Sequence, residues 1–203
     1  MPHGSDSSPP RTAPQPPLPA PGVVNLANGL TMLRLVLVPV FVLFLVQGGP
    51  GWRVAAFFAF AIASFTDLLD GRVARSRGLI TDFGKIADPI ADKALTGSAL
   101  VTLSVLGQLA WWVTVVIIVR EVAVTGLRFW VIRRGVIAAS RGGKLKTLLQ
   151  VVAIALYVLP GPGEIAREVV MAAAVVVTLV TGVDYAVRAV RLRLRSPADR
   201  DHS

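Results

Sequence analysis

Apolar residues follow one another along this chain in runs long enough to cross a lipid bilayer. Six such runs are separated by short polar, basic or glycine- and proline-rich segments, and a membrane-spanning helix needs about 20 mainly apolar residues. The predicted spans are residues 30–46, 52–69, 90–106, 109–132, 145–159 and 165–187. The pattern therefore predicts an all-α membrane protein with six transmembrane helices.

Proline-rich or basic segments flank this apolar part at both ends. Residues 1–24 contain eight prolines and little apolar bulk, so we expect a disordered N-terminal tail. They lack the basic start and short apolar core of a signal peptide. Residues 25–190 form the predicted six-helix domain. Residues 191–203 form a basic C-terminal tail, which either rests on anionic headgroups or is simply solvated.

Composition supports a membrane protein. Hydrophobic residues make up 54% of the 203 residues and charged residues only 16%, whereas a soluble domain holds about 25% charged residues. The absence of cysteine excludes disulfides and thiolate metal sites. The net charge of +9 is compatible with nucleic acid, but the apolar runs favour a basic face toward anionic lipid, with no nucleic-acid partner.

The distribution of lysine and arginine predicts the orientation. With six spans, both termini and the connections 70–88 and 133–146 lie on one side of the membrane. The three turns on the other side hold only Arg53 and Arg167 of the 21 basic residues. The positive-inside rule places the basic side, with both termini, in the cytoplasm. We therefore expect a multi-pass protein of the cell (inner) membrane.

Four aspartates stand where the second predicted span ends and the third begins. Asp67 and Asp70 are three residues apart, and Asp88 and Asp92 are four apart, so each pair shares a helix face. Pro89 predicts that Asp88 is the N-cap or a first-turn residue of the third helix. Four carboxylates facing lipid would cost on the order of 10 kcal/mol, so they are expected to line a polar cavity. Such oxygen ligands suit Mg²⁺, Mn²⁺ or Ca²⁺, as a pair of ions on a diphosphate.

An ordinary charge on a cytoplasmic loop is the alternative for each aspartate, for example Asp70 paired with Arg72 or Arg75. Four aspartates at these spacings favour the metal site. Gly71 and Ala74 leave a shallow notch beside Asp70 on the same helix. The notch fits either the close approach of a ligand or simple helix packing.

The stretch "DLLDGRVARSRGLITDFGKIADPIAD", residues 67–92, resembles the signature of the CDP-alcohol phosphatidyltransferase family, and every fixed position of the signature is filled. Further segments are similar to one branch of it, the bacterial phosphatidylglycerophosphate synthases of actinobacterial type. They are "NLANGLTMLRLVLVPVF" at 25–41, "TDFGKIADPIADK" at 81–93, "REVAVTGLR" at 120–128 and "GKLKT" at 143–147.

The resemblance implies a six-helix transferase, often a homodimer, with a polar cavity open to the cytoplasm. It would join CDP-diacylglycerol to an alcohol and release CMP, using two divalent cations, Mg²⁺ or Mn²⁺. The implied metal ligands are Asp67, Asp70, Asp88 and Asp92. The implied CDP-diacylglycerol contacts are Asn28, Gly71, Ala74, Arg75 and Thr81. Asp92 would also be the catalytic general base.

The acceptor alcohol is predicted from cations near this site, because an acceptor that carries phosphate needs them. Arg120 and Arg128 are eight apart on the fourth span and share a face, while Lys144 and Lys146 begin the fifth. These cations suit an acceptor that carries phosphate, and the resemblance of "REVAVTGLR" and "GKLKT" to the family implies that it is glycerol 3-phosphate, which would give phosphatidylglycerophosphate in phospholipid biosynthesis. An intramembrane arginine predicts function, although Arg120 could instead pair with Glu121 or a backbone carbonyl.

Other functions stay open at this point. A cardiolipin synthase of the same family would accept phosphatidylglycerol, and an inositol-phosphate or serine transferase would accept a soluble alcohol. A divalent-cation transporter is the alternative of another class, but it should place polar residues deep in several spans. A basic membrane scaffold would not need the small residues at fixed spacing.

Overall fold

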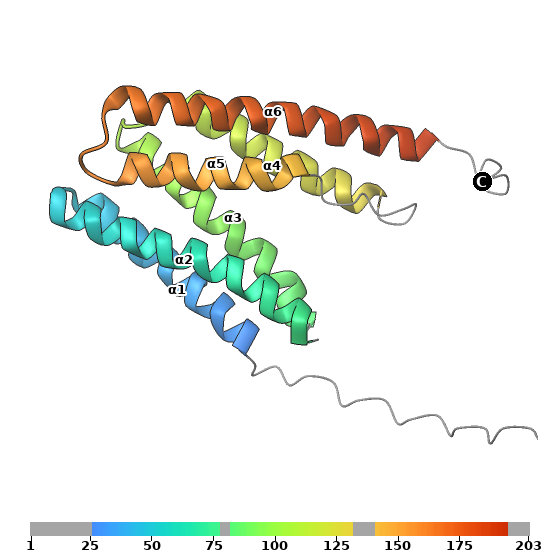
Figure 1. Cartoon of the computed structure of the whole chain (residues 1–203), viewed down its shortest axis with the longest axis horizontal. Helices are drawn as coiled ribbons and strands as arrows, with labels where there is room; N and C mark the ends of the chain where they lie inside the picture. Colours follow the sequence, from blue (N-terminus) through green and yellow to red (C-terminus); the bar gives the residue numbers. More distant parts are fainter. Residues whose placement is uncertain (1–25, 78–81, 132–140, 195–203) are drawn as a thin grey trace, which may run out of the picture.

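The computed structural model describes residues 26–77, 82–131 and 141–194, which form six α-helices and no strand (Figure 1). The helices are α1 (Leu26–Gln47), α2 (Pro50–Arg77), α3 (Asp82–Val105), α4 (Trp111–Val131), α5 (Arg141–Val158) and α6 (Glu164–Leu194). The six predicted helices are thus confirmed in number and order. The N-terminal tail predicted over residues 1–24 lies outside the described residues, whereas 191–194 of the predicted C-terminal tail continue α6.

Glycines with positive φ end three of the helices. Gly48 and Gly49, with φ of 69° and 78°, follow α1, and Pro50 is the first residue of α2. Gly107 (φ 69°) follows α3, and Gly161 (φ 110°) follows α5. A residue without a Cβ adopts this left-handed conformation at no steric cost, and proline suits a first helical position. These turns make antiparallel pairs of α1 with α2, α3 with α4 and α5 with α6.

The two helices that carry the aspartates, α2 and α3, extend about eight residues beyond the apolar runs that predicted them. α2 continues past residue 69 to Arg77, and α3 begins at Asp82 rather than near residue 90. Asp88 and Pro89 therefore lie inside α3, and the prediction that they belong to its first turn is wrong. Proline removes one backbone hydrogen bond inside a helix, but neighbouring helices can compensate for this in membrane proteins.

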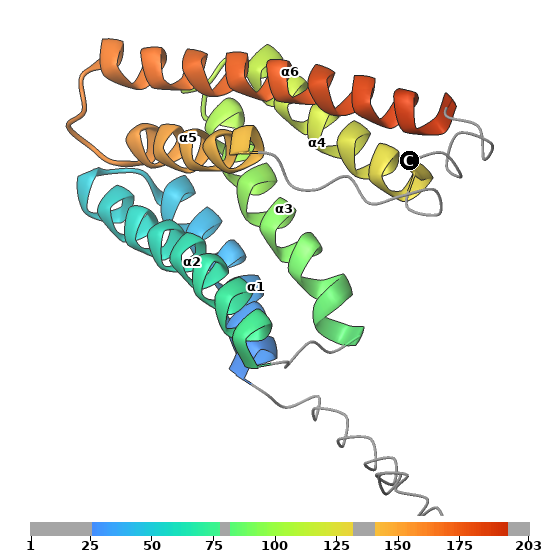
Figure 2. The same ribbon diagram turned by 45° about the vertical axis from the view of Figure 1, so that its right-hand side comes forward.

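The helices form two groups of three (Figures 1 and 2). α1 packs against α2 and α3, and α6 packs against α4 and α5. The groups meet where α5 contacts α2 and α3, and where α3 contacts α4. Figure 1 shows the three glycine turns at one end of the molecule. The start of α1, the end of α2 and the start of α3 lie toward the other end.

Small and aromatic side chains fill the space between the helices. Ala56, Ala63 and Ala99 are fully buried and allow close helix approach, and the rings of Phe41 and Phe60 lie 5.6 Å apart between α1 and α2. Outside this core, large apolar side chains are exposed on all six helices; examples, in helix order, are Leu43, Phe58, Val101, Val119, Leu148 and Val180. An apolar surface of this extent is typical of proteins in contact with lipid or partners.

By length and apolar character, two segments of the described chain could cross a membrane, Gly29–Gln47 in α1 and Glu164–Leu192 in α6. The prediction of six transmembrane helices is therefore not established for α2, α3, α4 and α5 by this criterion.

Candidate active site

The four predicted metal ligands lie on two consecutive helices. Asp67 and Asp70 belong to the second half of α2, and Asp88 and Asp92 to the first half of α3. Because only residues 78–81 separate these helices, the end of α2 and the start of α3 are within about 19 Å of each other. The structure describes the backbone at these positions but not the aspartate side chains. Metal ligation by them therefore stays a prediction.

Four of the five predicted contacts for CDP-diacylglycerol share this end of the molecule. Gly71, Ala74 and Arg75 lie in the same part of α2 as the first aspartate pair, and Asn28 lies in the first turn of α1. Their side chains are outside the described set, and Thr81 is outside the described residues altogether. The roles assigned to these five residues also stay predictions.

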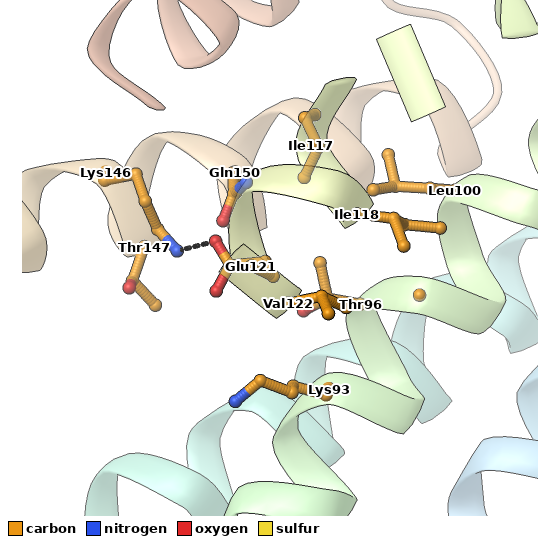
Figure 3. Close-up of a pocket in the computed structure, with 11 residues that line it drawn as sticks. Lys93, Thr96, Leu100, Ile117, Ile118, Glu121, Val122, Lys146, Thr147 and Gln150 are labelled. Atoms are coloured by element: carbon orange, nitrogen blue, oxygen red, sulfur yellow. Dashed lines mark hydrogen bonds and ion pairs between the residues drawn. The ribbon is translucent and has the colours of Figure 1, made fainter. Parts of the chain in front are cut away.

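A cavity of about 110 Å³ lies between α3, α4 and α5 (Figure 3). One of its lining residues, Lys93, directly follows Asp92 in the sequence. Lys93 and Thr96 reach it from α3, Glu121 from α4, and Lys146 and Gln150 from α5. Apolar side chains of α3 and α4 complete its walls. Sites for drug-sized ligands measure about 300–1,000 Å³, so this cavity suits a small polar group rather than a lipid.

Glu121 is the acidic residue among the described side chains that line this cavity. The Lys146 Nζ donates a short hydrogen bond to Glu121 Oε1 across the gap between α5 and α4 (Figure 3). The Arg120 Nη1 donates to the same oxygen at 3.2 Å. Only 9% of the Lys146 side chain is exposed. A buried ammonium group is costly without an anionic partner, and Glu121 provides one.

Arg120 itself faces α6 rather than the cavity. Its Nε donates to the backbone oxygen of Thr178 at 3.1 Å, and its Nη2 donates to Thr181 Oγ1 at 2.9 Å. Gly182 leaves room for this side chain, because a Cβ there would lie 3.1 Å from Arg120 Cγ. Direct contact between Arg120 and an acceptor phosphate would require the guanidinium to leave α6. Through Glu121, however, the arginine is linked to the cavity.

The other predicted acceptor contacts differ in their surroundings. Lys146 is buried and lines the cavity, whereas Lys144 is exposed on α5. Residues two apart on a helix point in nearly opposite directions, which explains the difference. Arg128 belongs to α4, but its side chain is outside the described set. Of the three predicted acceptor cations with described side chains, Lys146 is the one that reaches the cavity.

The sequence pattern of the CDP-alcohol phosphatidyltransferase family matches residues 24–180, which is most of the chain. The chain belongs to this family. Within it, a probable phosphatidylglycerophosphate synthase of Mycobacterium tuberculosis is 59% identical over 174 residues, covering 83% of this chain and 83% of that protein.

Two relatives from other bacteria share the name CDP-diacylglycerol–glycerol-3-phosphate 3-phosphatidyltransferase. The Bacillus subtilis protein is 36% identical over 179 residues, 79% of this chain and 93% of that protein. The Escherichia coli protein is 37% identical over 137 residues, 64% of this chain and 75% of that protein.

Sequence reasoning did not assign five polar residues to this phosphatidyltransferase's cavity: Lys93, Thr96, Glu121, Thr147 and Gln150. Glu121 was considered only as a neighbour of Arg120, since its contact with Lys146 joins positions 25 residues apart. Its place inside an apolar run was the available signal, because charges within such runs are usually functional. Among the side chains that the structure describes, no three His, Asp or Glu residues gather as a metal site. The four motif aspartates are not among those side chains.

Proposed function

We propose that this chain transfers the phosphatidyl group of CDP-diacylglycerol to glycerol 3-phosphate, giving phosphatidylglycerophosphate and CMP in phospholipid biosynthesis. The observation that carries the proposal is the 59% identity to a probable phosphatidylglycerophosphate synthase over 83% of both chains. The complete family signature on α2 and α3 supports the reaction type. The lysine-lined cavity beside that signature supports a phosphorylated acceptor.

The residues of the signature divide the chemistry between them. Asp92 takes the proton from the free primary hydroxyl of glycerol 3-phosphate. The hydroxyl oxygen then forms a bond to the lipid-bearing phosphorus, and the bond from that phosphorus to the bridging oxygen breaks, so that CMP leaves. Gly71 and Ala74 leave space for the nucleotide to approach α2, and Asn28, Arg75 and Thr81 bind and orient it.

Two divalent cations, Mg²⁺ or Mn²⁺, complete the proposed site, held by Asp67, Asp70, Asp88 and Asp92. The donor set fits hard cations, because it consists of carboxylates in a chain without cysteine. The fold supports shared ligation, since the two pairs lie in the halves of α2 and α3 that are joined by four residues. When bound, such ions neutralise the charge of the diphosphate and of the departing CMP.

The proposed location is the cell (inner) membrane, with six transmembrane helices and with both termini and the active-site cavity in the cytoplasm. Trp111 and Trp130 support this placement. Both are exposed, at opposite ends of α4, and 19 residues of helix separate them by about 28 Å. Tryptophan prefers the two membrane interfaces, and the hydrocarbon core is about 30 Å thick.

For the acceptor, we propose that Lys146 binds the phosphate of glycerol 3-phosphate directly. Lys144 and Arg128 are proposed as further phosphate contacts, and Arg120 as a contact that acts through Glu121 or after release from α6. By family resemblance we also propose a homodimer, which light scattering of the purified protein would test. Membrane lipid surrounds the apolar outer faces of the helices.

The test is product formation by the purified protein in detergent, with Mg²⁺ or Mn²⁺, CDP-diacylglycerol and one acceptor at a time. Lipid products are identified by mass spectrometry, and CMP release is followed in parallel. Phosphatidylglycerophosphate should form from glycerol 3-phosphate, and removal of the metal with EDTA should stop its formation. Asp92→Asn should abolish turnover, whereas Asp184→Asn, an exposed aspartate on α6, should not.

Other outcomes would redirect the proposal. Cardiolipin from phosphatidylglycerol, or product from inositol phosphate, would keep the reaction and reject the acceptor. The absence of CMP with every acceptor, in folded protein, would reject the enzyme and favour the cation transporter. Uptake of Mn²⁺ into proteoliposomes would then be measured.

A further inference from the structure

We propose that Glu121 is a positioning residue of the acceptor subsite, where its carboxylate holds Lys146 until an acceptor phosphate arrives and then weakens the hold on that phosphate. The inference rests on the proposed function for the identity of the acceptor. It adds an acidic residue to a subsite otherwise predicted from cations alone.

The first support is the position of the lysine. Lys146 Nζ lies against Glu121 Oε1, and its side chain is almost entirely shielded from solvent. In this place an ammonium group needs an anion at all times, because an unpaired buried charge is strongly destabilising. Before the acceptor binds, the described anion at Lys146 is the Glu121 carboxylate. A phosphate oxygen bound by Lys146 would take over this role.

The second support is the charge of the cavity. Among the described side chains, its lining holds two lysines, Lys93 on α3 and Lys146 on α5, but one carboxylate, Glu121 (Figure 3). Thr96 and Gln150 add polar groups that can hydrogen-bond an oxygen-rich ligand. The described side chains of the lining therefore carry an excess positive charge, with the two lysines on different helices. Such a lining suits a phosphate group, whereas the negative charge of Glu121 repels it.

The third support is that Glu121 is not required to join α4 to α6. Arg120 already binds α6 through Thr178 and Thr181 without the carboxylate. Meanwhile α4 and α5 are not among the helix pairs that pack closely in the described part of the chain. The bridge from Glu121 to Lys146 thus spans the cavity instead of reinforcing a packed interface. A purely structural salt bridge would be expected where helices pack.

These contacts determine what Glu121 does when phosphate binds. Arg120 keeps the carboxylate in place through its bond to Oε1, so Glu121 stays near a phosphate held by Lys146. Like charges at such short range repel, most strongly where water is scarce. Glu121 therefore limits the affinity of the subsite. This also favours release of the lipid product, which carries the same phosphate.

The experiment compares steady-state kinetics of wild-type protein and Glu121→Gln, varying glycerol 3-phosphate and CDP-diacylglycerol separately. The amide keeps the shape and removes the charge. KM for glycerol 3-phosphate should fall about two- to fivefold, the range set by loss of a partly exposed ion pair, while KM for CDP-diacylglycerol stays unchanged. The inhibition constant of inorganic phosphate against glycerol 3-phosphate should fall by a similar factor. Glu164→Gln, an exposed glutamate at the far end of α6, is the matched control and should change neither constant.

Glu121→Asp is the second variant, and it serves if Glu121→Gln does not fold. It keeps the charge but shortens the reach, so its KM for glycerol 3-phosphate should lie between those of wild type and Glu121→Gln. An unchanged or raised acceptor KM in folded variants would overturn the inference, as would equal changes for both substrates. If the wild-type protein turns over no acceptor, the proposed function fails instead. Calorimetric titration with inorganic phosphate then still decides the subsite, because Glu121→Gln must bind it more tightly than wild type does.

Discussion

Arg53 and Arg120 invite comparison, because each lies among apolar residues and donates to backbone oxygens of another helix. Arg53, near the start of α2, donates from Nε to the oxygen of Val158 at 3.0 Å and from Nη2 to that of Tyr157. These oxygens belong to the last turn of α5, where carbonyl groups lack partners within the helix. Arg53 therefore completes a helix end and joins α2 to α5.

Arg120 contacts the middle of a helix. The Thr178 oxygen lies within α6, not in its last turn, so Arg120 does not complete a helix end as Arg53 does. Gly182 of the same helix leaves room for the arginine side chain. Arg120 also binds an acidic neighbour, Glu121, which in turn binds the cavity lysine Lys146. The difference teaches that an arginine within an apolar run can be a purely structural connection or can link the scaffold to a polar site. Its acidic partners distinguish the two cases.

The largest expected effect is that of Lys146→Met, which removes one of the two lysine charges described in the cavity and keeps the apolar stem. Hydrogen bonds to charged groups contribute about 1.5–3 kcal/mol, so KM for glycerol 3-phosphate should rise about 10- to 100-fold. KM for CDP-diacylglycerol should stay the same. Lys144→Met changes an exposed lysine of the same helix and should raise the acceptor KM less. If the two variants raised the acceptor KM equally, the buried Lys146 would contribute no more to phosphate binding than the exposed Lys144 does.

Arg53→Met should instead reduce stability without changing the affinity for either substrate. Two carbonyl groups at the end of α5 lose a charged donor, at a cost of about 3 kcal/mol. The midpoint of unfolding in mixed SDS micelles measures the loss. Arg167→Met is the control, because Arg167 contacts only the Tyr157 ring at 5.5 Å and an exposed Glu164 among the partners described, and should lose about 1 kcal/mol or less. A changed acceptor KM in Arg53→Met would show that Arg53, like Arg120, is linked to the acceptor site and is not purely structural.

Gly182→Val tests the groove in which Arg120 lies. A Cβ at this position would already be 3.1 Å from Arg120 Cγ, and the branched side chain crowds the arginine further. Overpacking of this kind should cost about 1–2 kcal/mol of stability, read from the same unfolding midpoint. Gly182→Ala should be nearly neutral, because better helix propensity offsets the closer contact. Full stability of the valine variant would mean that Arg120 readily leaves α6.

The smallest effect is expected for Arg188→Gln. Arg188 Nε donates to Asp184 Oδ1 at 3.0 Å, one turn back on α6, and 55% of the arginine side chain is exposed. An exposed pair of this kind contributes about 0.5 kcal/mol or less, so the unfolding midpoint should hardly move. A loss as large as that of Arg53→Met would indicate that α6 forms contacts at this position in an assembly of several chains.

The helices could be predicted from the sequence because long apolar runs bounded by Gly and Pro leave few other structures. Their motif-bearing ends could not, since the residues around Asp70 and Asp88 are too polar to extend an apolar run yet still form helix. The aspartates themselves were found through spacing, which is a local property. The Glu121–Lys146 contact was missed because it depends on how α4 and α5 are placed around the cavity. No spacing rule within one helix reports a partner on another.

The glycine turns have a consequence for how the chain enters the membrane during synthesis. In the proposed orientation, each turn joins two spans into a hairpin whose tip must be translocated, and charges there oppose transfer. The tip between α3 and α4, residues 106–110, contains no charge. The tip between α1 and α2, residues 48–49, also contains none, and the nearest basic residue after it is Arg53, near the start of α2. Insertion can therefore proceed hairpin by hairpin in chain order. Because α5 supplies one wall of the cavity, the acceptor subsite is completed only when the last hairpin has entered.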